Sequence, residues 1–201
     1  MKEIFLSASV PIKGRKYFTG ADPLLIHSAV RAFAMLALGR RRIVWGGHPS
    51  ITPMLWAACE SLGVKYAQCV TLYQSLYFEE MFPEENARFR NVKYVQKRKT
   101  LAESLLAMRA AMLQRRAIES AVFIGGMEGI ADEYLLFRKF QKAKPCLFVA
   151  APGGAARAIA FSNGYKVRED PAPTNFTKLY IEKLGIDPTE KRMIARRLPN
   201  D

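Results

Sequence analysis

Three short apolar runs in this chain each lead into a pair of glycines, and a stretch with helical spacing follows each pair. The runs are Ile43–Trp45, Ala121–Ile124 and Leu147–Ala150, and the pairs are Gly46-Gly47, Gly125-Gly126 and Gly153-Gly154. An alternation of short apolar runs and helical stretches is typical of a parallel sheet in an α/β fold. Glycine accepts a positive φ and lets the backbone approach a ligand. The repetition therefore predicts three glycine corners along one edge of a sheet.

The whole pattern predicts an α/β, Rossmann-like three-layer fold with a mostly parallel sheet of about six strands. We expect strands near residues 3–9, 42–45, 66–72, 92–95, 120–124 and 145–150. Helices are expected near 23–38, 53–62, 101–116, 130–142, 155–162 and 175–184. Asp22 should cap the first helix, Thr52 or Ser50 the second, and Thr100 with Glu103 the third through a capping box.

With 201 residues the chain is expected to form one domain over residues 1–201, with residues 168–201 as a C-terminal extension. No apolar run is long enough to span a bilayer, and the N-terminal segment lacks the features of a signal peptide. The cysteines at 59, 69 and 146 are expected to be free thiols in a reducing cytoplasm. Two histidines and no Cys-x-x-Cys argue against a zinc site, and no cofactor is indicated.

A net charge of +13 favours anionic partners, which include nucleotides, phosphorylated metabolites and nucleic acid. Clusters of basic residues lie at 40–42, 97–99, 191–192 and 196–197. Each cluster is also typical of a solvated end of a helix or strand. The charge therefore leaves nucleic-acid binding through a basic surface as the alternative to a small anionic ligand.

Ligands of open parallel sheets bind beyond the carboxyl ends of the strands. The chain has neither a Walker loop nor a G-x-G-x-x-G fingerprint, so it does not match the commonest phosphate-binding motifs. The candidate ligand-binding residues are those that follow the expected strands: Ser7, Ser9, Gly46, Gly47, His48, Ser50, Gly125, Gly126, Met127, Glu128, Gly129, Gly153 and Gly154. We expect the helix N-termini after the glycines to offer free N–H groups and partial positive charge to an anion.

The segment from Gly125 to Glu133 resembles the G-G-x-G-T-x-x-E signature of the Lonely Guy phosphoribohydrolases and the wider SLOG superfamily. The Ile43–Gly47 segment resembles the strand-two glycine corner of that family, and Arg109 lies where the family keeps an Arg-Lys pair. The resemblance implies a Rossmann-like fold that binds nucleotides or their derivatives. Some relatives hydrolyse the N-glycosidic bond of nucleoside monophosphates, and others sense nucleotide signals, including signals in bacterial anti-phage defence.

This chain departs from the signature at the same corner. One extra residue separates the glycine pair from Gly129, and Ile130 stands where the family has a phosphate-binding threonine. Met108 aligns with the family's arginine and Arg109 with its lysine, whereas Glu133 matches the functional glutamate. These departures favour a sensor or a divergent activity over the family's hydrolysis.

Two forms of the function stay open at this stage, sensing of a nucleotide-derived ligand and N-glycosidic hydrolysis or transfer. In the catalytic form, Glu133 would stabilise a cationic sugar and Arg109 would pair with the phosphate. The structural alternative makes Glu133 a solvated acid of the first helical turn and Arg109 an exposed helical arginine. The resemblance also implies a homo-oligomer, a dimer or higher, in which two subunits complete a site.

Overall fold

The computed structural model describes residues 1–164 and 174–194 of the chain. In this part of the chain, one sheet has strand order β4-β3-β2-β1-β5-β6, and every neighbouring pair is parallel. The strands are β1 (Glu3–Ser9), β2 (Arg42–Trp45), β3 (Val70–Ser75), β4 (Asn91–Val95), β5 (Ile118–Gly125) and β6 (Cys146–Val149). The predicted Rossmann-like α/β class with a parallel sheet is therefore confirmed.

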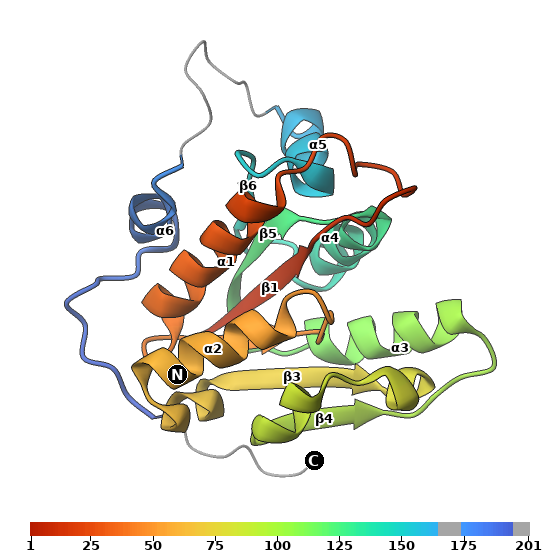
Figure 1. Cartoon of the computed structure of the whole chain (residues 1–201), viewed down its shortest axis with the longest axis horizontal. Coiled ribbons are helices and arrows are strands. Elements are labelled where there is room, and N and C mark those ends of the chain that lie inside the picture. The colour runs from red at the N-terminus through yellow and green to blue at the C-terminus, as the bar shows by residue number, and fades with distance from the viewer. Residues whose placement is uncertain (165–173, 195–201) are drawn as a thin grey trace.

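Helices cover both faces of this sheet (Figure 1). The α-helices are α1 (Pro23–Ala37), α2 (Thr52–Leu62), α3 (Leu101–Leu113), α4 (Glu128–Phe140), α5 (Gly154–Ser162) and α6 (Phe176–Leu184). The 3₁₀ helices are η1 (Val64–Cys69), η2 (Leu76–Met81) and η3 (Glu84–Arg88). Helices α1, α2 and α6 pack on one core, and α3, α4 and α5 pack on the other. Alternate strand residues supply the two cores, as Leu6 and Phe5 do on β1.

The strand expected at residues 66–72 is wrong at both ends. Val64–Cys69 forms η1, and β3 begins at Val70. Ala67 and Cys69 are both buried, so their alternation imitates a strand although the backbone is helical. At the other end β3 continues to Ser75, because β4 pairs with Gln74 and Ser75. The polar residues Gln74 and Ser75 thus belong to β3, although the apolar pattern predicted that the strand ends at residue 72.

The expected cap of α2 is also wrong. Thr52 is the first residue of α2, and the N-cap residue Ile51 makes no side-chain capping bond. The Thr52 hydroxyl instead donates to the His48 carbonyl and accepts from the indole N–H of Trp45. The hydroxyl of Ser50 accepts from the amide of Val10. Both hydroxyls therefore connect loops of the structure, which a local capping rule does not consider.

The C-terminal segment contributes to the main core. Phe176 and Tyr180 of α6 are buried against α1, and the Tyr180 hydroxyl donates to the Ala29 carbonyl at 3.0 Å. The segment expected as a C-terminal extension thus contains a helix that completes the α1 face of the sheet. Of the predicted extension, residues 168–173 and 195–201 lie outside the described part of the chain, and with them the basic pair at 196–197.

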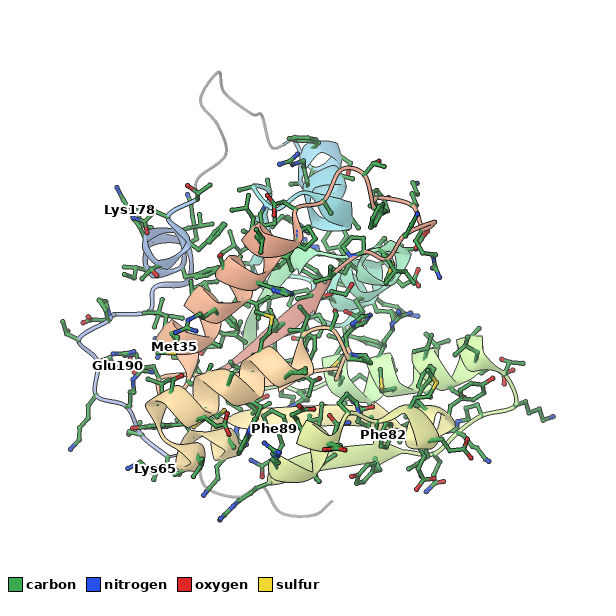
Figure 2. All side chains as sticks on the ribbon, viewed as in Figure 1. Met35, Lys65, Phe82, Phe89, Lys178 and Glu190 are labelled. Atoms are coloured by element: carbon green, nitrogen blue, oxygen red, sulfur yellow. The ribbon has the colours of Figure 1, made fainter. Side chains whose placement is uncertain are left out.

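The basic cluster at residues 40–42 has structural partners. The Arg42 guanidinium lies 3.7 Å from the Glu3 carboxylate, which also accepts two hydrogen bonds from Arg115 at 2.5 and 2.7 Å. Arg41 forms an ion pair with Glu190 at 2.8 Å. Figure 2 shows Glu190 on the segment after α6, near Met35 of α1. These charges connect the amino ends of the strands with the segment after α6. They are therefore not a free surface for nucleic acid.

Candidate ligand-binding site

Strands β1 and β5 lie side by side where the strand order reverses, and their carboxyl ends face the same way (Figure 1). Ser9 at the end of β1 is in register with Gly125 at the end of β5. Ile124 is in register with Val149 of β6, one residue before that strand turns towards α5. The three glycine corners therefore meet at one edge of the sheet. Such an edge is the usual ligand crevice of an open parallel sheet.

The first and third corners are filled by the chain itself. A Cβ on Gly47 would lie 1.5 Å from the side-chain nitrogen of Gln74, and a Cβ on Gly153 would lie 1.8 Å from the Gly20 carbonyl oxygen. A Cβ on Gly154 would lie 2.5 Å from the backbone of Gly125. These positions need glycine because neighbouring loops approach closely. The need for glycine there is explained without a ligand.

The N-termini of α2 and α5 are likewise engaged by the chain's own backbone. The amide of Thr52 donates to the His48 carbonyl at 3.1 Å. At the start of α5, the amide of Gly154 donates to Gly20 and the amide of Ala155 donates to Gly126. These N–H groups are therefore not available to an anion in this arrangement. This argues against the prediction that the N-termini of α2 and α5 bind an anion.

The middle corner differs in its backbone. As at α2 and α5, the N-cap residue of α4 makes no side-chain capping bond, but no carbonyl in the described ranges accepts from the amides of Glu128 and Gly129. The side chain of Ile130 covers Gly126, where an added Cβ would lie 1.9 Å from its terminal methyl group. An added Cβ on Gly129 would lie 2.8 Å from Nη2 of Arg109, so glycine leaves room there for a guanidinium. The positive end of α4 and a cation thus lie together at this corner.

A partly buried network of side chains lies beside that helix N-terminus. The Ser7 hydroxyl donates to Oε2 of Glu133 at 2.5 Å, and Oε1 of Glu133 lies 3.5 Å from Nε of Arg109. Arg109 also donates to Asp132 at 3.0 Å. Nε of Arg109 is buried and has no hydrogen-bond partner within the described residues. The network joins β1, α3 and α4, and it contains a charged donor that an anionic ligand can use.

Burial raises the pKa of the Glu133 carboxyl, while Arg109 and Ser7 act to lower it. Glu133 lies in the second turn of α4, because this helix begins at Glu128, earlier than expected. Its side chain is only 17% exposed. The structural alternative of a solvated first-turn acid is therefore wrong. A carboxylate held in a poorly hydrated place beside a cation is typical of functional sites.

The loop between β1 and α1 adds a second cation to this edge. Arg15 donates to the carboxylate of Glu128 at 3.0 Å, and both side chains are about half exposed. The pKa of Glu128 is lowered, first by its own backbone N–H and then by Arg15. This ion pair ties the loop to the first residue of α4. Sequence reasoning missed Arg15, although the basic segment Lys13–Lys16 directly after the first strand was a usable signal.

His48 and Ser50 tie the β2 corner to the same loop. Nδ1 of His48 accepts from the amide of Ser50 at 3.2 Å and lies 2.9 Å from its hydroxyl, which in turn accepts from the amide of Val10. Burial lowers the pKa of His48, which favours the neutral ring. Since Nδ1 is an acceptor, the proton of the neutral ring is assigned to Nε2. His48 thus has a structural role here and keeps one donor nitrogen.

The remaining candidate Ser9 and two aromatic side chains on β2 and β3 are buried in the fold. Ser9 is buried, and its carbonyl accepts from the amide of Gly126 at 2.8 Å. Trp45 and Tyr73 are also buried, and the Tyr73 hydroxyl accepts from Arg115 at the amino edge. Asp132 is exposed but pairs with Arg109. The sequence showed no sign of that pairing, because 23 residues separate the two side chains.

A groove of about 660 Å³ lies between α3 and α4, beside this network. Arg109 and Asp132 lie at its polar end, and leucines of both helices line the rest, among them Leu101, Leu106 and Leu135. These three leucines are 44%, 53% and 66% exposed. The groove is therefore an apolar surface that continues into the charged site.

Residues 16–184 match the model of the SLOG cluster3 family. No curated protein matches the chain. None of the helices in the described ranges is long and apolar enough to cross a membrane. Within the same ranges, no three His, Cys, Asp or Glu side chains are grouped as a metal would need.

Proposed function

The chain belongs to the SLOG cluster3 family, and we propose that it binds a nucleotide or a nucleotide-derived small molecule as a ligand sensor. The observation that carries the proposal is the network of Ser7, Glu133 and Arg109 beside the N-terminus of α4. An uncapped helix N-terminus next to a guanidinium favours a phosphate group, because partial and full positive charges act at the same point.

In this proposal the phosphate lies at the middle glycine corner. The buried Nε of Arg109, which lacks a hydrogen-bond partner among the described residues, would gain one in a phosphate oxygen. Residues 125–129 supply the backbone of this corner, and Ser7 supplies a hydroxyl from β1. The two other glycine pairs, with Ser9, His48 and Ser50, would form the walls that hold the corner in place.

Sensing is favoured over catalysis by the state of Glu133. Its Oε2 accepts a hydrogen bond from Ser7 and its Oε1 forms an ion pair with Arg109 at 3.5 Å, so the carboxylate is directed into the protein's own network. The second candidate is hydrolysis at an N-glycosidic bond, which the raised pKa and burial of Glu133 support. Water would then add its hydroxyl to C1′ of the sugar and its proton to the departing base.

The apolar groove between α3 and α4 supports a homo-oligomer as part of the proposal. Its exposed leucines adjoin the Arg109–Asp132 pair, so a second copy packed there would cover the leucines and enclose one side of the site. Exposed contiguous apolar surface commonly marks such an interface.

The first test is mass spectrometry of any small molecule released from protein purified natively. Calorimetry would then measure binding of the identified nucleotide to Arg109→Ala and, as a control, Arg116→Ala, whose side chain is exposed three residues beyond α3. We expect at least about a tenfold loss of affinity for Arg109→Ala and none for the control. Equal affinity of Arg109→Ala and the unsubstituted protein would overturn the assignment.

A second test separates the forms of the function. Incubation of the identified nucleotide with fresh protein, followed by chromatography of the products, should show intact nucleotide if the chain is a sensor. Release of free base that Glu133→Ala abolishes would instead establish the hydrolase. Nucleic-acid binding, the alternative raised by the charge, predicts affinity for a DNA or RNA strand that falls steeply with salt.

A further inference from the structure

A second hollow lies at the opposite edge of the sheet, near the amino ends of β3 and β4. Its volume is about 370 Å³, and it is lined by Trp56, Val64, Lys65, Gln68, Arg88 and Arg90. These residues come from α2, from η1 just before β3, and from the segment around η3 just before β4. Figure 2 labels Lys65 near the end of α2 and Phe89 between α2 and the sheet. Since β3 has six residues, about 20 Å of strand separates this hollow from the carboxyl edge.

Positive charge dominates the lining of this hollow. It contains two arginines, one lysine and no acidic residue. Arg88 lies 3.9 Å from Glu60, and both side chains are about half exposed, which makes this a weak ion pair. Lys65 and Arg90 form no ion pair with any residue of the described ranges, in contrast to Arg41 and Arg42. Nζ of Lys65 lies 5.6 Å from the centre of the Tyr66 ring, which leaves its charge without a carboxylate partner. The hollow therefore keeps two cationic groups that no acid of the described ranges neutralises.

The indole of Trp56 supplies a donor at the same place. The Arg88 guanidinium lies 5.3 Å from the centre of its ring, and the Phe89 ring meets it edge-on at 5.9 Å. These contacts hold the indole in position. Nε1 of Trp56 is buried and has no hydrogen-bond partner in the described part of the chain. A buried N–H without an acceptor is unfavourable, so the site is suited to an acceptor brought by a ligand.

We propose that this hollow is a second anion site, which binds the phosphate group of a small phosphorylated molecule. Lys65 and Arg90 supply counter-charge, and Gln68 and the Trp56 N–H supply neutral donors. The acids at 60, 84 and 85 lie outside the lining on the same two helices, α2 and η3, where they would repel an extended polyanion. A volume of this size fits a small molecule.

Tryptophan fluorescence provides a built-in test. The chain has two tryptophans, and Trp45 is buried in the core with its N–H donated to Thr52. Titration with pyrophosphate at constant ionic strength should therefore change the emission of Trp56, with saturation below about 1 mM. The same titration on Trp45→Phe should keep the change. No change in emission over this range would overturn the proposal.

Calorimetric titration of variants with pyrophosphate checks the lining. We expect Lys65→Gln combined with Arg90→Gln to weaken binding at least tenfold, and Trp56→Phe to weaken it severalfold. Lys142→Gln is the control for lost charge, since Lys142 is exposed beyond α4, and Arg109→Ala is the control for the nucleotide site. Equal weakening by Lys142→Gln, or loss of binding in Arg109→Ala alone, would overturn a separate site. Tighter binding of a single-stranded oligonucleotide than of a mononucleotide would overturn the small-molecule assignment.

Discussion

Glu133 shows how burial and pairing act in opposite directions on a single residue. Removal from water raises the pKa of its carboxyl, and this effect outweighs the influence of Arg109 and Ser7. The motif resemblance selected Glu133 from the sequence, but its environment depends on Ser7, 126 residues away. The chemical state of the residue is therefore a property of three elements packed together.

Glu133→Gln is expected to change how stability depends on pH. Because the folded pKa is raised above the usual 4.5, the contribution of Glu133 to stability is fully present below pH 4.5 and is lost as pH rises through the folded value. As pH rises from 4 to 7, the Tm of Glu133→Gln should therefore increase relative to the Tm of the unsubstituted protein. Asp132→Asn, on the exposed neighbour, is the control. Parallel profiles for the unsubstituted protein and Glu133→Gln would contradict the role of burial.

Glu3→Ala is expected to destabilise the protein strongly. The substitution leaves the guanidinium groups of Arg42 and Arg115 without their shared carboxylate at a site where Glu3 is 3% exposed. Breaking such a buried group of charges costs about 3–5 kcal/mol of the free energy of unfolding. Urea denaturation would measure the loss. Glu119→Ala, which breaks an exposed ion pair with Lys2, should cost no more than about 1 kcal/mol. Similar losses for the two variants would argue against the buried cluster.

At the scale of the elements, α3 shows a local capping signal that agrees with the structure. The predicted capping box is confirmed, since Thr100 accepts from the amide of Glu103 and Glu103 accepts from the amide of Thr100. The helix ends at Leu113, three residues earlier than expected. Capping depends on residues a few positions apart, so the sequence contains all of its determinants.

Thr100→Ala should lower the free energy of unfolding by about 1 kcal/mol, because α3 loses its side-chain cap. Thermal or urea denaturation is sufficient to measure the difference. Thr100→Ser keeps the hydroxyl and should cost clearly less. If alanine and serine gave the same stability, the capping bond would make no net contribution.

Other elements were decided by contacts between distant segments. Thr52 and Ser50 have the side chains of typical capping residues, but they bond to Trp45, His48 and Val10 instead. Strand β3 extends through Ser75 because β4 supplies the pairing partner. The third glycine pair, predicted as a ligand corner, packs against Gly20 and Gly125. No local rule includes these neighbours, and this is why the local predictions failed there.

At the scale of the whole molecule, the net charge of +13 comes from two kinds of basic residue: those paired with acids in the fold and those without an acidic partner in the described ranges. Arg41 and Arg42 are engaged with acids of distant segments, whereas Lys65 and Arg90 line a hollow without such partners in the described ranges. The charge count alone could not separate these groups. The anionic-partner prediction therefore depends on where the unengaged cations lie.

Leu106→Glu combined with Leu135→Glu should shift the protein from oligomer to monomer. Both leucines are more than half exposed in the groove between α3 and α4, where a second copy would bury them, and a buried unpaired carboxylate is strongly unfavourable. Light scattering after size-exclusion chromatography would give the mass. Leu24→Glu, on the exposed face of α1, should leave the mass unchanged. A monomeric unsubstituted protein would contradict the proposed oligomer.

The sequence by itself determined the three-layer α/β class, the parallel sheet, most helices and the meeting of three glycine corners at the carboxyl ends of the strands. These features follow from periodicity, capping and strand alternation, which are local. Only the tertiary structure decided which helix N-terminus keeps amides without a backbone acceptor in the described ranges, because Gly20, Gln74 and Gly126 reach the other corners from distant parts of the chain. It also decided that Arg109 lies between Asp132 and Glu133, since a contact across two helices depends on their packing and not on spacing within either one.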